Sequence, residues 1–292
     1  MNQIVILGHS GFIGSSLKSY FEDKTEIKIA GHSYPEIDLK KIDSVEKLEK
    51  YFHPNVTVIL VAAVKRQFGD TLDTFYENIQ ITKNICHLLE KKPINRLIFF
   101  SSTAVYGEET ENNNINEKTA INLTSYYGIS KYTSERLLKK SFSAGNIKSL
   151  VCLRPPLIYG EGDTANTYGP SSFVNSAILG QSITLWGDGS ELREFIYIND
   201  LCYLIDCLLE SKFYGDLNVV SGVSYSFSEI IQLLETKYSD LVVNSKSRSK
   251  NKADNVFDAT KVKAILPNNF EFTSLNNGLA KLISYHTSLH GN

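Results

Sequence analysis

The stretch that decides the fold is IVILGHSGFIG, residues 4–14. Its first four residues are apolar and predict a short buried strand. Gly8, Gly11 and Gly14 follow at once and open a segment with helical periodicity. Glycines permit a tight turn and let backbone N–H groups approach a phosphate at the start of a helix. The stretch therefore predicts a strand–turn–helix unit that binds the diphosphate of a dinucleotide.

Apolar strand-like runs alternate with helix-like segments through the first half of the chain. The expected strands are residues 4–7, 27–30, 56–63, 97–100 and 150–153, and the expected helices are residues 12–22, 44–52, 71–91 and 125–142. Such alternation indicates βαβ units and a parallel sheet with right-handed crossovers. We therefore predict an α/β fold with a Rossmann-type, doubly wound parallel sheet that binds the dinucleotide and is formed by residues 1–159.

The second half of the chain has a different character. Shorter expected elements follow a Gly-, Asp- and Thr-rich loop at 160–170: helices at 173–179, 200–209 and 227–237, and strands at 183–186 and 194–198. Residues 245–252 are polar and basic and predict a solvated loop. We expect residues 160–292 to form a smaller α/β substrate-binding lobe, interwoven with the core. A ligand cleft is expected between the two, beyond the carboxyl ends of the strands.

Composition and charge exclude several classes of protein. The 292 residues carry 30 Lys+Arg and 32 Asp+Glu, so no basic excess points to nucleic acid or anionic lipid. No run approaches the about 18 apolar residues of a membrane span, and the first eight residues lack the basic leader of a signal peptide. The four cysteines show neither CxxC spacing nor clustered histidines, which argues against metal and disulfides. A cytoplasmic protein without metal, membrane or nucleic-acid partner is expected.

The end of the second expected strand bears on the choice of dinucleotide. It reads Ala30-Gly31-His32-Ser33 and carries no acidic residue. An Asp or Glu at this place normally binds the ribose 2′-hydroxyl of NAD and repels a 2′-phosphate. Its absence, with His32 and Ser33 as candidate donors, favours NADP(H); NAD(H) is the alternative, and an ordinary polar turn would explain the same residues.

Two further segments carry side chains suited to proton transfer. Tyr127 and Lys131 are four residues apart in an expected helix, so they share one helical face. An ammonium near a phenol lowers the phenol's pKa, which would let Tyr127 exchange a proton with a sugar hydroxyl or carbonyl. Ser102 follows the strand that ends at Phe100, where a hydroxyl could bond the same substrate oxygen.

In this order along the chain, these motifs resemble the extended short-chain dehydrogenase/reductase superfamily, in its nucleotide-sugar epimerase/dehydratase/reductase branch. The matching stretches are GHSGFIG at 8–14, DL at 38–39, AA at 62–63, SSTAVYG at 101–107, YGISK at 127–131, RPPLIYG at 154–160 and WGDGSELREFIYIND at 186–200. The resemblance implies an NAD(P) cofactor, a nucleotide-diphosphate sugar as substrate, and a homodimer formed through helices like 71–91 and 125–142.

The resemblance also implies roles for individual residues. Ser102 aligns with the catalytic Ser/Thr, Tyr127 with the acid/base, and Lys131 with its partner, which also contacts the nicotinamide ribose. Asp38 and Leu39 match the pair that flanks the adenine. The full implied cofactor set is Gly8, Ser10, Gly11, Phe12, Ile13, Gly14, His32, Ser33, Asp38, Leu39, Ala62, Ala63, Tyr127, Lys131 and Pro155.

The implied substrate contacts are Thr103, Arg193 and Arg248. Arg193 is similar to the arginine that contacts the sugar nucleotide's diphosphate, a role that suits the fork of a guanidinium; a surface salt bridge is the alternative. Arg248 could also meet the phosphates, although its loop favours a solvated charge. Leu157 stands where many members of the family carry an asparagine, which removes one expected substrate contact.

The residues after Ser102 narrow the reaction. Dehydratases of this branch typically carry an Asp-Glu pair where this chain has Thr103-Ala104, and decarboxylases carry a Glu at the place of Ala104. Neither residue titrates usefully, which disfavours both reactions. The favoured function is an NADPH-dependent 4-ketoreductase of a nucleotide-linked 4-keto-(6-deoxy)hexose in surface-polysaccharide sugar biosynthesis. The alternatives are a 4-epimerase with tightly bound NAD and a catalytically inactive dinucleotide-binding regulatory protein.

Overall fold

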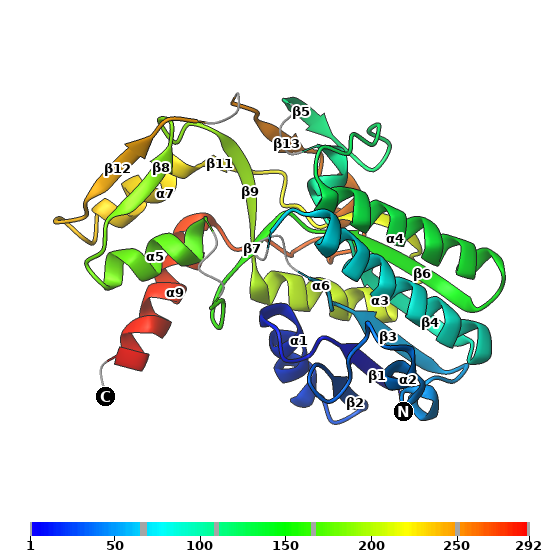
Figure 1. The fold of residues 1–292 in the computed structure, drawn as a ribbon. Helices are drawn as coiled ribbons and strands as arrows, with labels where there is room; N and C mark the ends of the chain where they lie inside the picture. Colours follow the sequence, from blue (N-terminus) through cyan, green and yellow to red (C-terminus); the bar gives the residue numbers. More distant parts are fainter. Residues whose placement is uncertain (1, 65–68, 108–110, 165–167, 249–251, 291–292) are drawn as a thin grey trace. The chain divides into compact units, whose positions relative to one another are not determined.

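One six-stranded parallel sheet forms the centre of the first of two units in this computed structural model (Figure 1). The strand order is β10-β6-β4-β3-β1-β2, with β1 at Asn2–Leu7, β2 at Ile27–His32, β3 at Val56–Leu60, β4 at Ile94–Phe100, β6 at Ile147–Arg154 and β10 at Gly215–Asn218. Strand β2 lies on one side of β1 and β3 on the other, so the direction in which strands are added to the sheet reverses at β1. This reversal is the switch point at which such sheets bind ligands, and it confirms the predicted Rossmann-type fold.

The structure describes residues 2–64, 69–107, 111–164, 168–248 and 252–290. The first unit comprises Met1–Gly107, Ala120–Pro155 and Leu208–Asn218, and the second comprises Glu108–Thr119, Pro156–Cys207 and Val219–Asn292. Three separate segments therefore build each unit.

Burial on both faces explains the apolar strands of the first unit. Consecutive residues of β1, such as Val5 and Ile6, are both fully buried although they point to opposite faces. Helix α3 (Leu72–Lys91) packs along α4 (Tyr126–Ser143), and both contribute to one apolar core with the sheet. Helix α1 (Phe12–Glu22) packs on β1 and β2.

Side-chain caps set where α3 and α4 begin. The Thr71 hydroxyl accepts the backbone N–H of Thr74, and the Thr74 hydroxyl caps Thr71 in return. The Ser125 hydroxyl accepts the N–H of Gly128 at 3.0 Å. Such caps satisfy N–H groups that a helix cannot pair internally. The predicted helix 44–52 is wrong as one element, because α2 (Ile42–Glu46) is followed by a separate 3₁₀ turn at Glu49–Tyr51.

The second unit combines small sheets with helices. Strand β9 (Leu192–Tyr197) pairs with β7 (Leu157–Tyr159) and β11 (Ser224–Ser226), β8 (Ile183–Trp186) pairs with β12 (Val243–Lys246), and β5 (Asn112–Ile115) pairs with β13 (Asn255–Phe257). The helices are α5 (Pro170–Ile178), α7 (Phe227–Glu235), α8 (Thr260–Lys263) and α9 (Leu275–His290), and α6 (Ile198–Glu210) starts in this unit and ends in the first. Aromatic side chains, among them Phe173, Phe195 and Phe227, fill the core of the second unit.

Within the described residues, none of the helices is both long enough and apolar enough to cross a membrane. The same part of the chain contains no group of three or more His, Cys, Asp or Glu side chains that could hold a metal ion.

Arg96 is a buried cation that secures the end of α6 to the sheet. It lies in β4, is only 6% exposed, and donates to four backbone carbonyls, those of Leu208 at 2.5 Å, Leu209 at 3.4 Å, Ser211 at 3.0 Å and Phe213 at 2.5 Å. The last carbonyls of a helix have no partner within the helix. The guanidinium therefore acts as the C-terminal cap of α6.

We expect Arg96→Met to lower the free energy of unfolding by about 3 kcal/mol, because several buried carbonyls lose a charged donor. Urea unfolding followed by circular dichroism measures this change. Lys148→Met, at an exposed position of β6, is the matched control and should change the value by less than about 0.5 kcal/mol. Equal stabilities of the two variants would contradict this role of Arg96.

Candidate active site and dinucleotide site

The glycine turn is built from backbone contacts that side chains would prevent. Gly8 has φ +97°, and a Cβ at this position would lie 2.7 Å from the N atom of Ala62. A Cβ on Gly14 would lie 2.1 Å from the carbonyl oxygen of Gly8. The N–H groups of Gly8 and Ala62 donate to His32 and Leu7 respectively, which joins the ends of β1 and β2 and the segment after β3. Glycine is therefore required at both positions.

The N-terminus of α1 is open toward this turn. Its first residue, Phe12, follows Gly11, which has extended backbone and offers no side-chain cap. The N–H groups at the start of the helix are thus left for an anion, and the helix dipole favours negative charge there. The residues around the turn therefore fit the diphosphate of a dinucleotide.

Ser33 is bonded to the glycine turn. Its hydroxyl accepts the N–H of Ser10 at 3.0 Å and is hydrogen-bonded to Nδ1 of His9 at 3.0 Å. The neighbouring His32 ring is buried against Tyr51, with the ring centroids 4.4 Å apart, and burial lowers its pKa. The structure therefore shows Ser33 supporting the turn and His32 held toward its neutral form.

The segments that carry the other predicted cofactor residues are held by amides of α3. Asn84 Nδ2 donates to the carbonyl of Leu39 at 2.9 Å. Asn78 bonds both backbone groups of Val64, accepting its N–H at 2.8 Å and donating to its carbonyl at 3.1 Å. These bonds hold the Asp38-Leu39 pair and the chain just after Ala62 and Ala63. No local sequence pattern marks Asn84 for this role, because its partner lies 45 residues earlier in the chain.

The Ser102 segment leaves the carboxyl end of β4 as a 3₁₀ turn, Thr103–Tyr106. The Ser102 hydroxyl caps this turn by accepting the N–H of Ala104 at 3.1 Å, and the N–H of Thr103 donates to the carbonyl of Pro155 at 3.0 Å. A Cβ on Gly128 would lie 2.8 Å from the carbonyl oxygen of Ala104. Glycine beside Tyr127 thus lets the start of α4 approach the Ser102 turn closely.

Lys131 is buried beside the ring of Tyr127. Its ammonium donates to the carbonyl of Phe100 at 2.6 Å and lies 5.6 Å from the centroid of the Tyr127 ring. Burial lowers the pKa of Lys131 to about 8, against the charge of Glu135, which raises it. The side-chain carboxylate of Asp70 accepts the backbone N–H of Tyr127 at 2.9 Å. The structure therefore brings Tyr127 and Lys131 together at the end of β4, as the four-residue spacing predicts.

Two predicted substrate residues meet in the second unit around one carboxylate. Arg193 bonds Glu191 and the carbonyls of Leu192 and Ala253, and Nη1 of Arg248 lies 3.7 Å from the other oxygen of Glu191. The prediction of a solvated Arg248 is wrong: its side chain is 17% exposed, because it lies against the turn at Gly187 and pairs with Asp188 at 2.9 Å. Two guanidiniums thus converge on one anion. The end of the loop predicted at 245–252, residues 249–251, lies outside the described residues.

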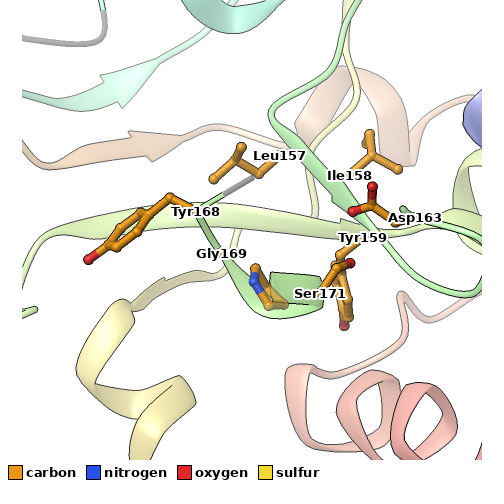
Figure 2. Close-up of a pocket in the computed structure, with 8 residues that line it drawn as sticks. Leu157, Ile158, Tyr159, Asp163, Tyr168, Gly169 and Ser171 are labelled. Carbon is orange, nitrogen blue, oxygen red and sulfur yellow. The ribbon is translucent and has the colours of Figure 1, made fainter. Parts of the chain in front are cut away.

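The second unit also contains a pocket at the start of α5. Figure 2 shows the residues that line it, among them Leu157, the position at which the resemblance implies an asparagine. The residues that line it are Leu157, Ile158, Tyr159, Asp163, Tyr168, Gly169, Pro170 and Ser171. Leucine at 157 makes this wall apolar. The Tyr159 hydroxyl is buried and has no hydrogen-bond partner among the described residues.

The fold and these sites define a dinucleotide-binding protein of the doubly wound class. A sequence model of the NAD dependent epimerase/dehydratase family matches residues 4–220. The chain belongs to this family, which establishes it as an enzyme of the nucleotide-sugar epimerase, dehydratase and reductase type.

Similar proteins with assigned activities include both epimerases and oxidoreductases. The chain is 25% identical to GDP-6-deoxy-D-talose 4-dehydrogenase of Aggregatibacter actinomycetemcomitans, over 94% of each chain. It is 28% identical to N-acetyl-alpha-D-glucosaminyl-diphospho-ditrans,octacis-undecaprenol 4-epimerase of Escherichia coli O157:H7, over 72% of this chain and 64% of that protein. Among solved structures, UDP-glucose 4-epimerase of Thermotoga maritima with UDP-glucose aligns over 99% of both chains, with a TM-score of 0.86 and 21% identity.

We expect Ser33→Ala to weaken the binding of NADPH and NADH equally, by about fivefold, because it removes a hydrogen bond that shapes the turn both cofactors share. Fluorescence titration of the purified protein measures both dissociation constants. Ser19→Ala, on the exposed side of α1, is the control and should leave them unchanged. A loss confined to NADPH would instead assign Ser33 to the 2′-phosphate.

Proposed function

We propose that this enzyme is a 4-ketoreductase that transfers a hydride from a nicotinamide cofactor to a nucleotide-linked 4-keto-6-deoxyhexose. One observation carries the proposal: the buried Lys131 ammonium, held on the carbonyl of Phe100, lies beside the Tyr127 ring at the carboxyl end of the sheet. A phenol next to an ammonium is suited to give a proton to an oxygen that becomes negative. Ser102, at the end of the same strand, adds a second hydroxyl.

The roles of the side chains follow from this arrangement. When bound, the reduced nicotinamide supplies the hydride that reaches C4 of the sugar. Tyr127 donates its proton to the C4 oxygen as that oxygen gains charge, and the Lys131 ammonium stabilises the phenolate that is left. The Ser102 hydroxyl orients the carbonyl. A proton from solvent then restores Tyr127.

The two residues that follow Ser102, Thr103 and Ala104, carry no acid or base, which supports simple carbonyl reduction. Ala104 is buried at 1% exposure and Thr103 bonds the carbonyl of Pro155. Loss of water or of carbon dioxide from a sugar requires an additional acid and base. The similarity to GDP-6-deoxy-D-talose 4-dehydrogenase over nearly the whole chain agrees with an oxidoreductase acting at C4.

Arg193 and Arg248 are the groups we assign to the substrate's diphosphate. The two side chains are 19% and 17% exposed, and both lie beside the carboxylate of Glu191, with Arg248 also paired with Asp188 at 2.9 Å. Paired guanidiniums of this kind bind phosphate oxygens with defined geometry. In this proposal the diphosphate replaces Glu191 as the anion between them.

A 4-epimerase with tightly bound NAD is the second candidate, and one observation favours it. His32 is held toward its neutral form by burial, and the Ser33 hydroxyl is engaged by the turn. Neither residue presents a positive charge, which a 2′-phosphate would require for strong binding. This weakens the argument for NADP(H) that the missing acidic residue supplied.

A homodimer formed through α3 and α4 is also proposed. The N-terminal ends of these helices adjoin, since Asp70 bonds the N–H of Tyr127, and large apolar side chains there are exposed. They are Leu72, Tyr76 and Tyr126. Apolar groups of this size, close together on a surface, are typical of a protein–protein interface.

The dinucleotide that accompanies the purified protein separates the two reactions. Denaturation releases it, mass spectrometry identifies it, and the emptied protein is then titrated with NADPH and NADH. For a reductase we expect an empty site that binds a reduced cofactor reversibly, because that cofactor is exchanged in every turnover. Stoichiometric NAD⁺ would instead establish the internal redox cycle of an epimerase.

We expect Tyr127→Phe to lower kcat at least about 100-fold, because it removes the proton donor, and to leave dinucleotide affinity within about twofold. Activity is measured on GDP-6-deoxytalose, UDP-glucose and UDP-N-acetylglucosamine with each oxidised cofactor. Tyr126→Phe, the exposed neighbouring residue, is the matched control and should be fully active. Full activity of Tyr127→Phe would refute the mechanism, and dinucleotide binding without any turnover by the wild type would favour the inactive regulatory protein.

A further inference from the structure

Glu135 is a fully buried carboxylate on the helix that carries Tyr127 and Lys131. It lies one turn beyond Lys131, so the three side chains follow each other along one face of α4. The resemblance and the proposed mechanism give it no role. A buried charge is costly unless it is paired and hydrogen-bonded, so its partners show what it does.

The first partner of Glu135 is Ser101, the residue before Ser102. The Ser101 hydroxyl donates to Oε1 of Glu135 at 2.6 Å, which bonds the end of β4 to the middle of α4. The same carboxylate therefore positions two residues. It holds Ser102 through the bond to the adjacent Ser101, and it holds Lys131 because both residues lie on α4.

The second partner is Arg154, at the end of β6. Its Nε donates to Oε1 at 2.9 Å and its Nη2 to Oε2 at 2.6 Å, so the guanidinium engages both oxygens. Arg154 in turn donates to the hydroxyl of Tyr106 at 2.8 Å and to Asp216 at 2.9 Å. The pair is therefore fixed by further bonds, and the Glu135 charge cannot turn away from Lys131.

The charges of this cluster come from four elements of the first unit. Besides Lys131 and Glu135, the titratable or charged side chains are Tyr127 and Lys139 on α4, Tyr106 on the Ser102 turn, Cys152 and Arg154 on β6, and Asp216 on β10. Arg154 pairs with Glu135 at 2.6 Å and with Asp216 at 2.9 Å, and Lys139 lies 2.7 Å from Asp216 and 3.6 Å from Glu135. Glu135 is the carboxylate next to Lys131 on the same helix face, and its charge favours the protonated lysine.

We propose that Glu135 is a positioning residue of the active site, which bonds the Ser102 strand end to the Tyr127–Lys131 helix and supplies the negative charge that keeps Lys131 an ammonium. The inference rests on the proposed roles of Ser102, Tyr127 and Lys131. It assigns two separable effects to one carboxylate: the hydrogen bond to Ser101 and the charge beside Lys131.

The charge effect is tested by titrating Lys131 directly. In protein labelled with ¹³C-lysine, the ε-CH₂ signal of Lys131 is assigned by its absence in Lys131→Arg and followed with pH. We expect a midpoint near 8 in the wild type and, in Glu135→Gln, a midpoint lower by about one pH unit, because the favourable charge is lost. Glu135→Asp keeps the charge and should remain close to the wild type, as should Glu22→Gln, an exposed carboxylate on α1.

The positioning effect is tested with Ser101→Ala, which removes the bond and keeps the charge. We expect kcat on the best substrate of the panel to fall about tenfold, with the dinucleotide dissociation constant and the Lys131 midpoint unchanged. An unmoved midpoint in folded Glu135→Gln, or wild-type kcat in Ser101→Ala, would overturn the proposal. If Glu135→Gln does not fold, Ser101→Ala alone decides. Because the titration needs no substrate, and because Tyr127→Phe tests the mechanism separately, failure of this inference is distinguishable from failure of the proposed function.

Discussion

The first unit depends on the buried ion pair between Glu135 and Arg154. It joins α4 to β6, and through Ser101, Tyr106 and Asp216 it reaches β4, the Ser102 turn and β10. Two charges can be kept away from water only when their geometry is good and their remaining bonding groups are satisfied. Breaking the pair by removing one partner would leave an uncompensated charge in the core. The arrangement therefore fixes the relative position of the strand ends and the helix with little freedom, which the proposed proton transfer requires.

The cofactor site depends on a different constraint, close backbone approach. At Gly8 and Gly14 the neighbouring chain occupies the space a Cβ would need. The same contacts bring the ends of β1 and β2 and the segment after β3 to one place at the switch point of the sheet. Here geometry is set by the absence of side chains, whereas around Glu135 it is set by side-chain charge. The glycine turn is thus held by steric fit, and the residues proposed for proton transfer are held by electrostatics.

Sequence patterns predicted what is encoded locally. The helix at 12–22 and the strand at 183–186 agree with α1 and β8, since each has a strong pattern and a clear start. Strand β5 was missed because its sequence is Asn-Asn-Asn-Ile, and only pairing with distant β13 makes it a strand. The pairing of Tyr127 with Lys131 could be predicted because the two residues are only four positions apart in one helix. The partners of Glu135 and the sharing of Glu191 by two arginines could not, because they join residues far apart in the chain or depend on which way a loop turns.

Whether the enzyme is a reductase or an epimerase depends on how tightly it holds the dinucleotide. A reductase must release its oxidised cofactor after each turnover, whereas an epimerase must keep it. A positive charge at the end of β2 would bind a 2′-phosphate and so favour NADP(H). However, burial holds His32 toward its neutral form, and the Ser33 hydroxyl is bonded to the glycine turn. Neutral hydrogen bonds contribute less than an ion pair does, so these two residues would discriminate only weakly at the ribose. The glycine turn and the α1 N-terminus are the groups that fit the diphosphate common to both cofactors, so on this proposal the rate of cofactor exchange should depend mainly on them.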